Sequence, residues 1–274
     1  MKTIYCTLLF IVLVMTGCSK ASQPNDPIPE HETFTIDSKK VGEIRTINVW
    51  LPSDYASTTD SLAVLYMLDG GLKEDFPHIA NTLAELISSK QISPIILVGI
   101  ENTQRRRDLT GETKVEKDKE IAPVVGESDK FRRFVSDELF SEINKKYRTT
   151  NQKGIIGESL AGLFVVETFM LHPEMFDFYI AFDPSLWWND QYLLKTAKEH
   201  VSNISEGQQK RFWFAGSQAK DIAAATRSLA KVLETEKVSN LKWLYSDEPE
   251  EQHHTIFRAT KEKALIWTLN ENKD

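Results

Sequence analysis

The chain has 274 residues, of which 41% are hydrophobic and 27% are charged. This is the composition of an ordinary globular protein, with room for one domain and a sizeable core. Its formal net charge is −7 at pH 7. Nucleic acids and anionic membrane surfaces need a basic face on the protein that binds them, so this charge argues against both as the main partner.

The first 17 residues have the organisation of a secretory signal peptide. Lys2 supplies a positive start, and the apolar run from Ile4 to Met15 is too short to span a bilayer comfortably. The segment Val14-Met15-Thr16-Gly17-Cys18 resembles a bacterial lipobox. We therefore expect residues 1–17 to be removed and Cys18 to be lipidated. The mature protein would then lie in the bacterial cell envelope, facing the periplasm or the surface, with this anchor as its only contact with the membrane.

The residues after Cys18 separate the expected anchor from the folded part. Residues 18–30 are polar and contain three prolines, which predicts a tether, and residues 31–274 are expected to form the single folded domain. The two cysteines are Cys6 and Cys18. The mature domain therefore has no cysteine for a disulfide, a metal site or a thiol nucleophile.

Strand and helix signals alternate along residues 31–274. Alternating polar and apolar residues predict two antiparallel edge strands at the start, and continuous apolar runs predict buried strands afterwards. The predicted strands are His31–Ser38, Glu43–Leu51, Leu62–Leu68, Pro94–Ile100, the run before Ser159, Phe176–Phe182, Arg211–Ala215 and Leu241–Tyr245. The predicted helices are Phe76–Ser89, Ser128–Tyr147, the segment after Ser159, Gln191–Val201, Ile222–Thr235 and a closing helix.

This alternation predicts an α/β fold with a doubly wound, mostly parallel sheet and an antiparallel N-terminal edge. Such sheets place their sites at the carboxyl ends of the strands. Residues 111–126 show no period and are rich in lysine and glutamate. A segment of this kind and length in a compact domain is usually a lid or a disordered loop.

The segment around Ser159 predicts a nucleophile elbow. An apolar run enters Gly157-Glu158-Ser159-Leu160-Ala161-Gly162 and an apolar helical segment leaves it. The outgoing helix passes close to the incoming strand, so small residues are needed around the serine, and Gly157, Ala161 and Gly162 supply them. The alternative is a serine that only caps a helix.

A serine hydroxyl needs a base to remove its proton, and the base needs a third group to orient it. In this fold the order along the chain is serine, acid, histidine. His172 and His200 lie in or beside helical segments and are expected to be structural or exposed. The polar loop after the last predicted strand holds His253 and His254, and either has the right position for the base.

Five segments together closely resemble the Putative esterase family of α/β-hydrolases, which includes the enterobactin and salmochelin esterases, with feruloyl esterases as more distant relatives. The resemblance covers nearly the whole mature chain. The segments are Tyr66-Met67-Leu68-Asp69-Gly70-Gly71, Val98-Gly99-Ile100-Glu101-Asn102-Thr103, Arg105-Arg106-Arg107-Asp108-Leu109-Thr110, Gly157-Glu158-Ser159-Leu160-Ala161-Gly162 and Pro184-Ser185-Leu186-Trp187-Trp188.

The resemblance implies roles for particular residues. Ser159 would be the nucleophile, and the loop pattern Glu-x-His-x-Thr selects His253 as the base. The backbone N–H groups of Leu160 and of Gly70 or Gly71 would form the oxyanion hole. Relatives often place the acid a few residues after the strand that ends near Ala215, which makes Asp221 the best candidate. Asp221 would equally serve as the N-cap or first turn of the next helix.

Four further residues are candidates for substrate contact. Arg105 and Arg107 could meet an anionic or catecholate substrate, or pair with Asp108 and neighbouring carboxylates instead. Trp187 and Trp188 could form an aromatic wall, or one of them could pack in the core. No predicted helix carries paired histidines or clustered carboxylates, so we expect no metal and no cofactor.

These observations predict a cofactor-independent serine esterase that acts through an acyl-serine on a small-molecule or glycan-linked ester. Siderophore esters are the first substrate hypothesis, and feruloyl or acetyl esters of plant polysaccharide are the second. Transfer of the acyl group to an alcohol is a third possibility. The rival from another class is a non-catalytic lipoprotein that binds a siderophore or a glycan on the same scaffold.

Overall fold

The structure is a computed structural model that describes residues 26–122, 124–202, 204 and 209–270. The expected signal peptide, Cys18 and most of the expected tether lie outside the described residues. Within the described ranges, we find no helix with the length and apolar character needed to cross a membrane.

Eight strands form one sheet in the order β1-β2-β4-β3-β5-β6-β7-β8. The pairs β1–β2 and β2–β4 are antiparallel, and all other neighbours are parallel. The doubly wound, mostly parallel sheet with an antiparallel N-terminal edge is thereby confirmed. The strands are β1 (Glu32–Ser38), β2 (Glu43–Trp50), β3 (Leu62–Met67), β4 (Ile95–Ile100), β5 (Thr149–Glu158), β6 (Phe178–Phe182), β7 (Lys210–Ser217) and β8 (Leu241–Glu248).

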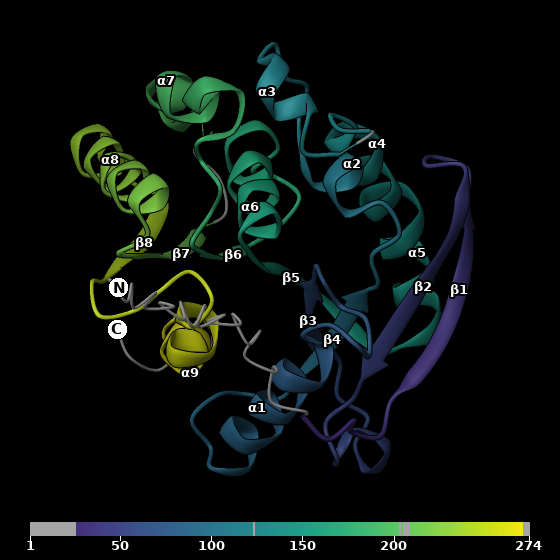
Figure 1. Ribbon diagram of the computed structural model, residues 1–274. Helices are drawn as coiled ribbons and strands as arrows, with labels where there is room; N and C mark the ends of the chain where they lie inside the picture. The colour runs from purple at the N-terminus through teal and green to yellow at the C-terminus, as the bar shows by residue number, and fades with distance from the viewer. Residues whose placement is uncertain (1–25, 123, 203, 205–208, 271–274) are drawn as a thin grey trace, which may run out of the picture.

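Helices cover both faces of the sheet. Figure 1 shows α1 and α9 on one face and the helices from α4 to α8 on the other. The helices are α1 (Phe76–Ser88), α2 (Arg105–Leu109), α3 (Glu116–Lys119), α4 (Ser128–Arg133), α5 (Phe140–Lys146), α6 (Leu160–Leu171), α7 (Trp188–Ser202), α8 (Lys220–Glu236) and α9 (Ile256–Leu269), with a 3-10 turn, η1 (Tyr55–Ser57), and a π-helical segment, η2 (Phe134–Leu139).

The core is divided by the sheet into two clusters. Successive residues of a strand point to opposite faces, so Tyr66 belongs to the cluster beneath α4 to α8, while Leu65 and Met67 belong to the cluster beneath α1 and α9. Because both faces of the central strands are covered, these strands read as continuous apolar runs in the sequence. That is why their positions could be predicted closely.

Two segments differ from the sequence-based expectation. The predicted helix Ser128–Tyr147 is interrupted by η2, where the buried Phe134, Val135 and Leu139 face the core. The segment 111–126 contains the short helix α3. Asp118 in α3 accepts hydrogen bonds from the hydroxyl of Thr113 (2.7 Å) and the backbone N–H of Asn189 (2.8 Å). These contacts hold this segment against the start of α7.

Candidate active site

Ser159 lies in a sharp turn between β5, which ends at Glu158, and α6, which begins at Leu160. Its backbone has φ 61° and ψ −118°, a conformation that is strained for a residue with a side chain. The turn is held by the N–H of Ser159, which donates to the carbonyl of Phe182 at 3.0 Å, and by the carbonyl of Ser159, which accepts from the N–H of Ser185 at 3.0 Å. This is the strand, turn and helix arrangement that the sequence predicts.

The small residues around the elbow have no room for a larger side chain. A Cβ atom on Gly157 would lie 2.7 Å from the Cβ of Ala161, and one on Gly162 would lie 2.9 Å from the carbonyl oxygen of Phe182. Both distances are well below van der Waals contact. The close crossing of β5 and α6 therefore depends on glycine at these two positions.

The loop after β8 brings His253 to the serine. Nε2 of His253 lies 3.1 Å from Oγ of Ser159. The loop is braced by Thr255, whose hydroxyl donates to the carboxylate of Glu251 at 2.6 Å, and by the N–H of Gln218, which donates to the carbonyl of Glu251 at 3.1 Å. The neighbouring His254 is exposed. Of the two histidines in this loop, the structure brings His253 to Ser159.

The carboxylate partner of His253 is Asp183, the residue directly after β6. Its Oδ2 lies 2.9 Å from Nδ1 of His253, and the residue is fully buried. An ionised carboxylate only accepts hydrogen bonds, so Nδ1 of His253 carries the proton and Nε2 is free to accept the hydroxyl of Ser159. Ser159, His253 and Asp183 therefore have the geometry of a serine, histidine and aspartate triad.

Asp221, the acid expected from the sequence, is not the partner of His253. It is an exposed residue in the first turn of α8 and lines a separate cavity of about 400 Å³. The physical reason is that β6 and β7 are parallel neighbours in register, with Phe182 opposite Ala215. Asp183, directly after β6, therefore lies at the same edge of the sheet as the end of β7, and it contacts His253. Asp183 could have been found as an aspartate directly after a predicted buried strand.

Charges around His253 favour its protonated form. The hydrogen bond to Asp183 raises the pKa of His253 above its ordinary value, burial opposes this rise, and the negative charges of Glu158 and Asp183 add to it. Burial in turn raises the pKa of Glu158 to about 8. Glu158 was not among the site residues predicted from the sequence, although its place beside the nucleophile could have suggested it.

Arg105 lies beside this group, at a cavity of about 460 Å³ next to the elbow. Its Nε and Nη2 bind the two carboxylate oxygens of Asp69 at 2.6 and 2.7 Å, and Nη2 also lies 3.4 Å from the carbonyl of Glu158. The cavity is lined by these three residues together with Glu74 and Asn102, among others. Arg105 is thus placed at the candidate site, with its charge balanced by Asp69.

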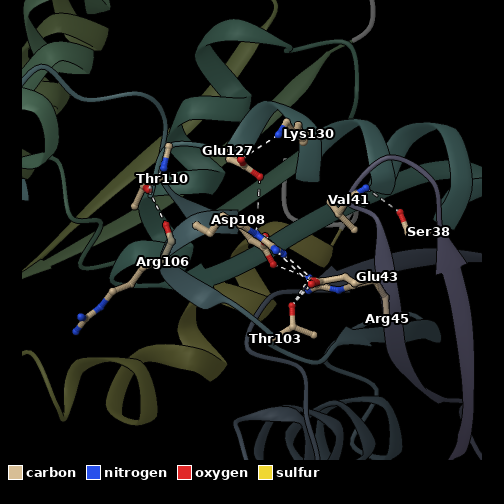
Figure 2. A network of polar contacts seen from close by, with 12 residues as sticks. Ser38, Val41, Glu43, Arg45, Thr103, Arg106, Asp108, Thr110, Glu127 and Lys130 are labelled. Carbon is tan, nitrogen blue, oxygen red and sulfur yellow. Dashed lines mark hydrogen bonds and ion pairs between the residues drawn. The ribbon is translucent and has the colours of Figure 1, made fainter. Parts of the chain in front are cut away.

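Arg107 does not lie at the site. Figure 2 shows the polar network to which it belongs, with Glu43, Arg45 and Asp108 at its centre and Arg106 pointing away from it. Arg107 is 7% exposed, and it binds Glu43 at 2.7 Å and Asp108 at 2.7 Å. The network joins β2 to α2. The guanidinium of Arg107 is therefore used in a buried ion cluster, and its expected contact with substrate is not supported.

The expected oxyanion donors differ in their availability. The N–H of Gly70 donates to the carbonyl of Ile100 at 2.9 Å, so the structure uses it within the fold. The N–H of Gly71 donates to the carboxylate of Glu74 at 2.7 Å. Leu160 is the first residue of α6, and the N–H groups of a first helical turn have no acceptor within the helix. Its N–H group directly follows the serine and remains the best-placed donor.

The two tryptophans have different surroundings. Trp188 is 5% exposed and its indole N–H donates to the carbonyl of Gly111 at 2.9 Å, so it anchors the 111–126 segment. Trp187 is partly buried and lines the cavity that also contains Asp221. One member of the pair therefore has a packing role. Among the residues that the structure describes, no three His, Cys, Asp or Glu side chains gather to hold a metal ion.

Comparison with known proteins decides the family. A model of the family described as Putative esterase matches residues 38–269. The chain belongs to the Putative esterase family. The match includes Ser159, Asp183 and His253, and the resemblance inferred from five short segments is confirmed.

Relatives of this esterase are known from two kinds of organism. Ferri-bacillibactin esterase BesA of Bacillus subtilis is 29% identical to it over 203 residues, which are 66% of this chain and 68% of BesA. The siderophore triacetylfusarinine C esterase of Aspergillus fumigatus is 28% identical over 189 residues, which are 64% of this chain and 62% of that protein.

Solved structures of other proteins have the same fold. The crystal structure of an IroE-like serine hydrolase from Shewanella oneidensis has a TM-score of 0.79 and 25% identity, and it covers 87% of this chain and 79% of the hydrolase. The expected α/β-hydrolase fold and the expected class of enzyme, a serine esterase, are both confirmed.

Proposed function

We propose that this esterase cleaves carboxylic esters through an acyl-serine intermediate, with Ser159 as nucleophile, His253 as base and Asp183 as the acid that orients it. The observation that carries this proposal is the continuous pair of contacts from Oγ of Ser159 to Nε2 of His253 (3.1 Å) and from Nδ1 of His253 to Asp183 (2.9 Å). It replaces Asp221 with Asp183 in the mechanism.

In the first half of the reaction, Nε2 of His253 takes the hydroxyl proton as Oγ of Ser159 attacks the ester carbonyl. The imidazolium that forms is stabilised by the buried carboxylate of Asp183. His253 then gives its proton to the leaving alcohol, and the acyl group stays on Ser159. In the second half His253 activates a water molecule, which releases the carboxylic acid and restores the serine.

The negative charge on the carbonyl oxygen requires hydrogen-bond donors, and one such donor contributes on the order of 3 kcal/mol to the transition state. We assign the N–H of Leu160 as the first donor. We assign the N–H of Gly71 as the second donor. In this role it releases the carboxylate of Glu74 and donates its hydrogen bond to the oxyanion instead.

Siderophore esters are the proposed substrates. Two observations support this class: the bacterial and fungal relatives are siderophore esterases, and a polar cavity of about 460 Å³ adjoins the elbow through Glu158 and Arg105. A cavity of this size accommodates one arm of a large polar ester.

The mechanism is tested by intact-mass spectrometry after exposure to a fluorophosphonate probe. We expect a single adduct on the wild-type protein, no adduct on Ser159→Ala, and strongly slowed labelling of His253→Ala. A wild-type protein that stays unlabelled while folded would contradict the proposal. It would direct attention to siderophore or glycan binding, which spectroscopic titration of Ser159→Ala with ferric siderophores would then measure.

The substrate class is tested by a panel of esters that contains ferric and iron-free siderophores, feruloyl and acetyl esters of plant polysaccharide, and an alcohol acceptor. Product analysis by chromatography separates the classes. Turnover of the siderophores at the highest kcat/KM is expected. Faster turnover of the feruloyl or acetyl esters, or ester exchange onto the alcohol, would contradict the assignment.

We also propose that the protein is anchored to the cell envelope through a lipid on Cys18. The lipobox-like segment Val14–Cys18 supports this. Mass spectrometry of the mature N-terminus should find a lipidated Cys18, and Cys18→Ser should release the protein from the membrane fraction. Recovery of both forms in the soluble fraction would exclude the anchor.

A further inference from the structure

Ser217 lies at the end of β7, behind the triad rather than in it. It is fully buried, as is Asp183. Because β6 and β7 run parallel in register up to Phe182 and Ala215, Asp183, which follows β6, comes beside the last residues of β7, which ends at Ser217. The N–H of Asp183 extends this pairing by donating to the carbonyl of Ala215 at 3.0 Å.

Both hydrogen-bond donors of Ser217 are directed at the Asp183 carboxylate. The backbone N–H of Ser217 donates to Oδ1 at 2.6 Å, and its hydroxyl donates to Oδ2 at 2.6 Å. Oδ2 is also the oxygen that lies 2.9 Å from Nδ1 of His253. One carboxylate oxygen therefore accepts hydrogen bonds from a serine hydroxyl and from the catalytic imidazole.

These contacts solve a physical problem at this position. Asp183 follows β6 directly and has a left-handed backbone with φ 43°, which is uncommon for a residue with a side chain. Its carboxylate is fully buried, and a buried charge is costly unless hydrogen bonds surround it. Two donors from one residue fix the plane of the carboxylate and compensate its burial.

We propose that Ser217 is a positioning residue, which holds the Asp183 carboxylate in the orientation that His253 requires and shares the charge of Oδ2 with it. This role rests on the esterase mechanism proposed above. Ser217 makes no contact with the reacting atoms and acts through Asp183 alone.

The shared oxygen predicts the direction of a pH effect. The hydroxyl of Ser217 withdraws part of the negative charge of Oδ2. Without it, Oδ2 interacts more strongly with the imidazolium form of His253, so the pKa of His253 rises. His253 must be neutral to act as a base, so the acid limb of the kcat/KM profile moves to higher pH. The other charges that act on His253 are those of Glu158 and Arg105, and variants of Ser217 leave both in place.

The experiment compares three substitutions of Ser217 with a matched control. Ser217→Ala removes the hydroxyl, Ser217→Cys keeps the approximate size with a weak donor, and Ser217→Thr keeps the hydroxyl. The control is Ser246→Ala, because Ser246 is a buried serine opposite Ala215 on β8 whose hydroxyl binds Glu248 and not Asp183. The readouts are the kcat and KM of an activated ester against pH, and the far-downfield proton NMR signal of the His253 Nδ1–H.

The alanine and cysteine variants should lose about tenfold in kcat, with KM unchanged, as expected for one hydrogen bond to a charged group. Their acid limb and the Nδ1–H signal should shift together, while Ser217→Thr and Ser246→Ala stay close to wild type. A purely structural role would lower thermal stability without moving the acid limb or the proton signal, and that result would overturn the proposal.

If Ser217→Ala does not fold, the cysteine and threonine variants decide, and identical pH profiles in the two would overturn the proposal. An inactive wild-type protein would be a failure of the esterase mechanism instead. The proton signal still reports on the contact between Asp183 and His253 in that case, so the two failures are distinguishable.

Discussion

Oδ2 of Asp183 lies 2.9 Å from Nδ1 of His253, although the two residues are 70 positions apart in the sequence. One follows β6 and the other lies in the loop after β8. The contact makes Asp183 the proposed acid, one strand earlier than the sequence pattern of relatives suggests.

Replacing Asp183 tests this assignment directly. In Asp183→Asn the amide offers a donor where the carboxylate accepted, so the Nδ1 proton of His253 loses its acceptor and the ring favours the wrong tautomer. We expect kcat to fall on the order of 10³- to 10⁴-fold. The matched variant Asp221→Asn, at the exposed start of α8, should keep kcat within about twofold. Steady-state kinetics on an activated ester measures both, and the reverse ranking would restore Asp221 as the acid.

Replacing Glu158 should leave the acid limb of the activity profile in place. Burial raises the pKa of Glu158 to about 8, so the carboxyl is mostly neutral below that pH, and its negative charge acts on the pKa of His253 mainly above it. Glu158→Gln keeps this neutral form, so the acid limb of kcat/KM should stay close to wild type, in contrast to the shift expected for Ser217→Ala. Glu85→Gln, at an exposed position of α1, serves as the control. A clear move of the acid limb to lower pH in Glu158→Gln would mean that Glu158 is ionised beside His253.

The same residue should make stability depend on pH. The pKa of Glu158 is about 8 in the folded protein and about 4.3 in an unfolded chain. Between these values the folded state holds a proton that the unfolded state has lost, so the free energy of unfolding falls as pH rises, by at most about 1.4 kcal/mol per pH unit. Below pH 4.3 this contribution is fully present, and it is lost as pH rises to 8.

Thermal unfolding followed by circular dichroism at pH 5 and pH 8.5 checks this. The Tm of the wild-type protein should drop more across this interval than the Tm of Glu158→Gln. His253, whose pKa is also raised in the folded state, contributes in the same direction in both proteins. Parallel Tm changes in the two proteins would show that Glu158 is ionised at low cost.

The network in Figure 2 predicts a contrast between neighbouring arginines. Arg107→Ala leaves the half-buried Glu43 and the buried Asp108 with Arg45 as their remaining cationic partner, and the lost charged hydrogen bonds should cost about 1.5–3 kcal/mol of unfolding free energy. Arg106→Ala removes an exposed side chain and should change stability by no more than about 0.5 kcal/mol. Urea unfolding measures both. A substrate-binding role for Arg107 would appear instead as a raised KM at unchanged stability.

The sequence by itself determined the sheet and the elbow, and it limited the base to His253 or His254. Buried central strands read as continuous apolar runs, so they can be located in the sequence. The crossing of β5 and α6 requires small residues, so Gly157, Ser159 and Gly162 form a recognisable local motif. The choice of His253 over His254 came from the resemblance of its loop to the family pattern Glu-x-His-x-Thr, in which Glu251 and Thr255 bind each other.

Only the tertiary structure decided the acid, the role of Arg107 and the state of the glycine amides. Each depends on which segments distant in the sequence are brought together. Asp183 meets Ser217 and His253 because the residue after β6 lies beside the last residues of the neighbouring strand β7. Arg107 meets Glu43 because tertiary folding brings a side chain of α2 to the start of β2, and Gly70 donates its N–H to Ile100 at the end of the neighbouring strand. The sequence does not reveal whether a carboxylate or guanidinium binds a substrate or another side chain. Its partner is determined by how the distant segments pack together.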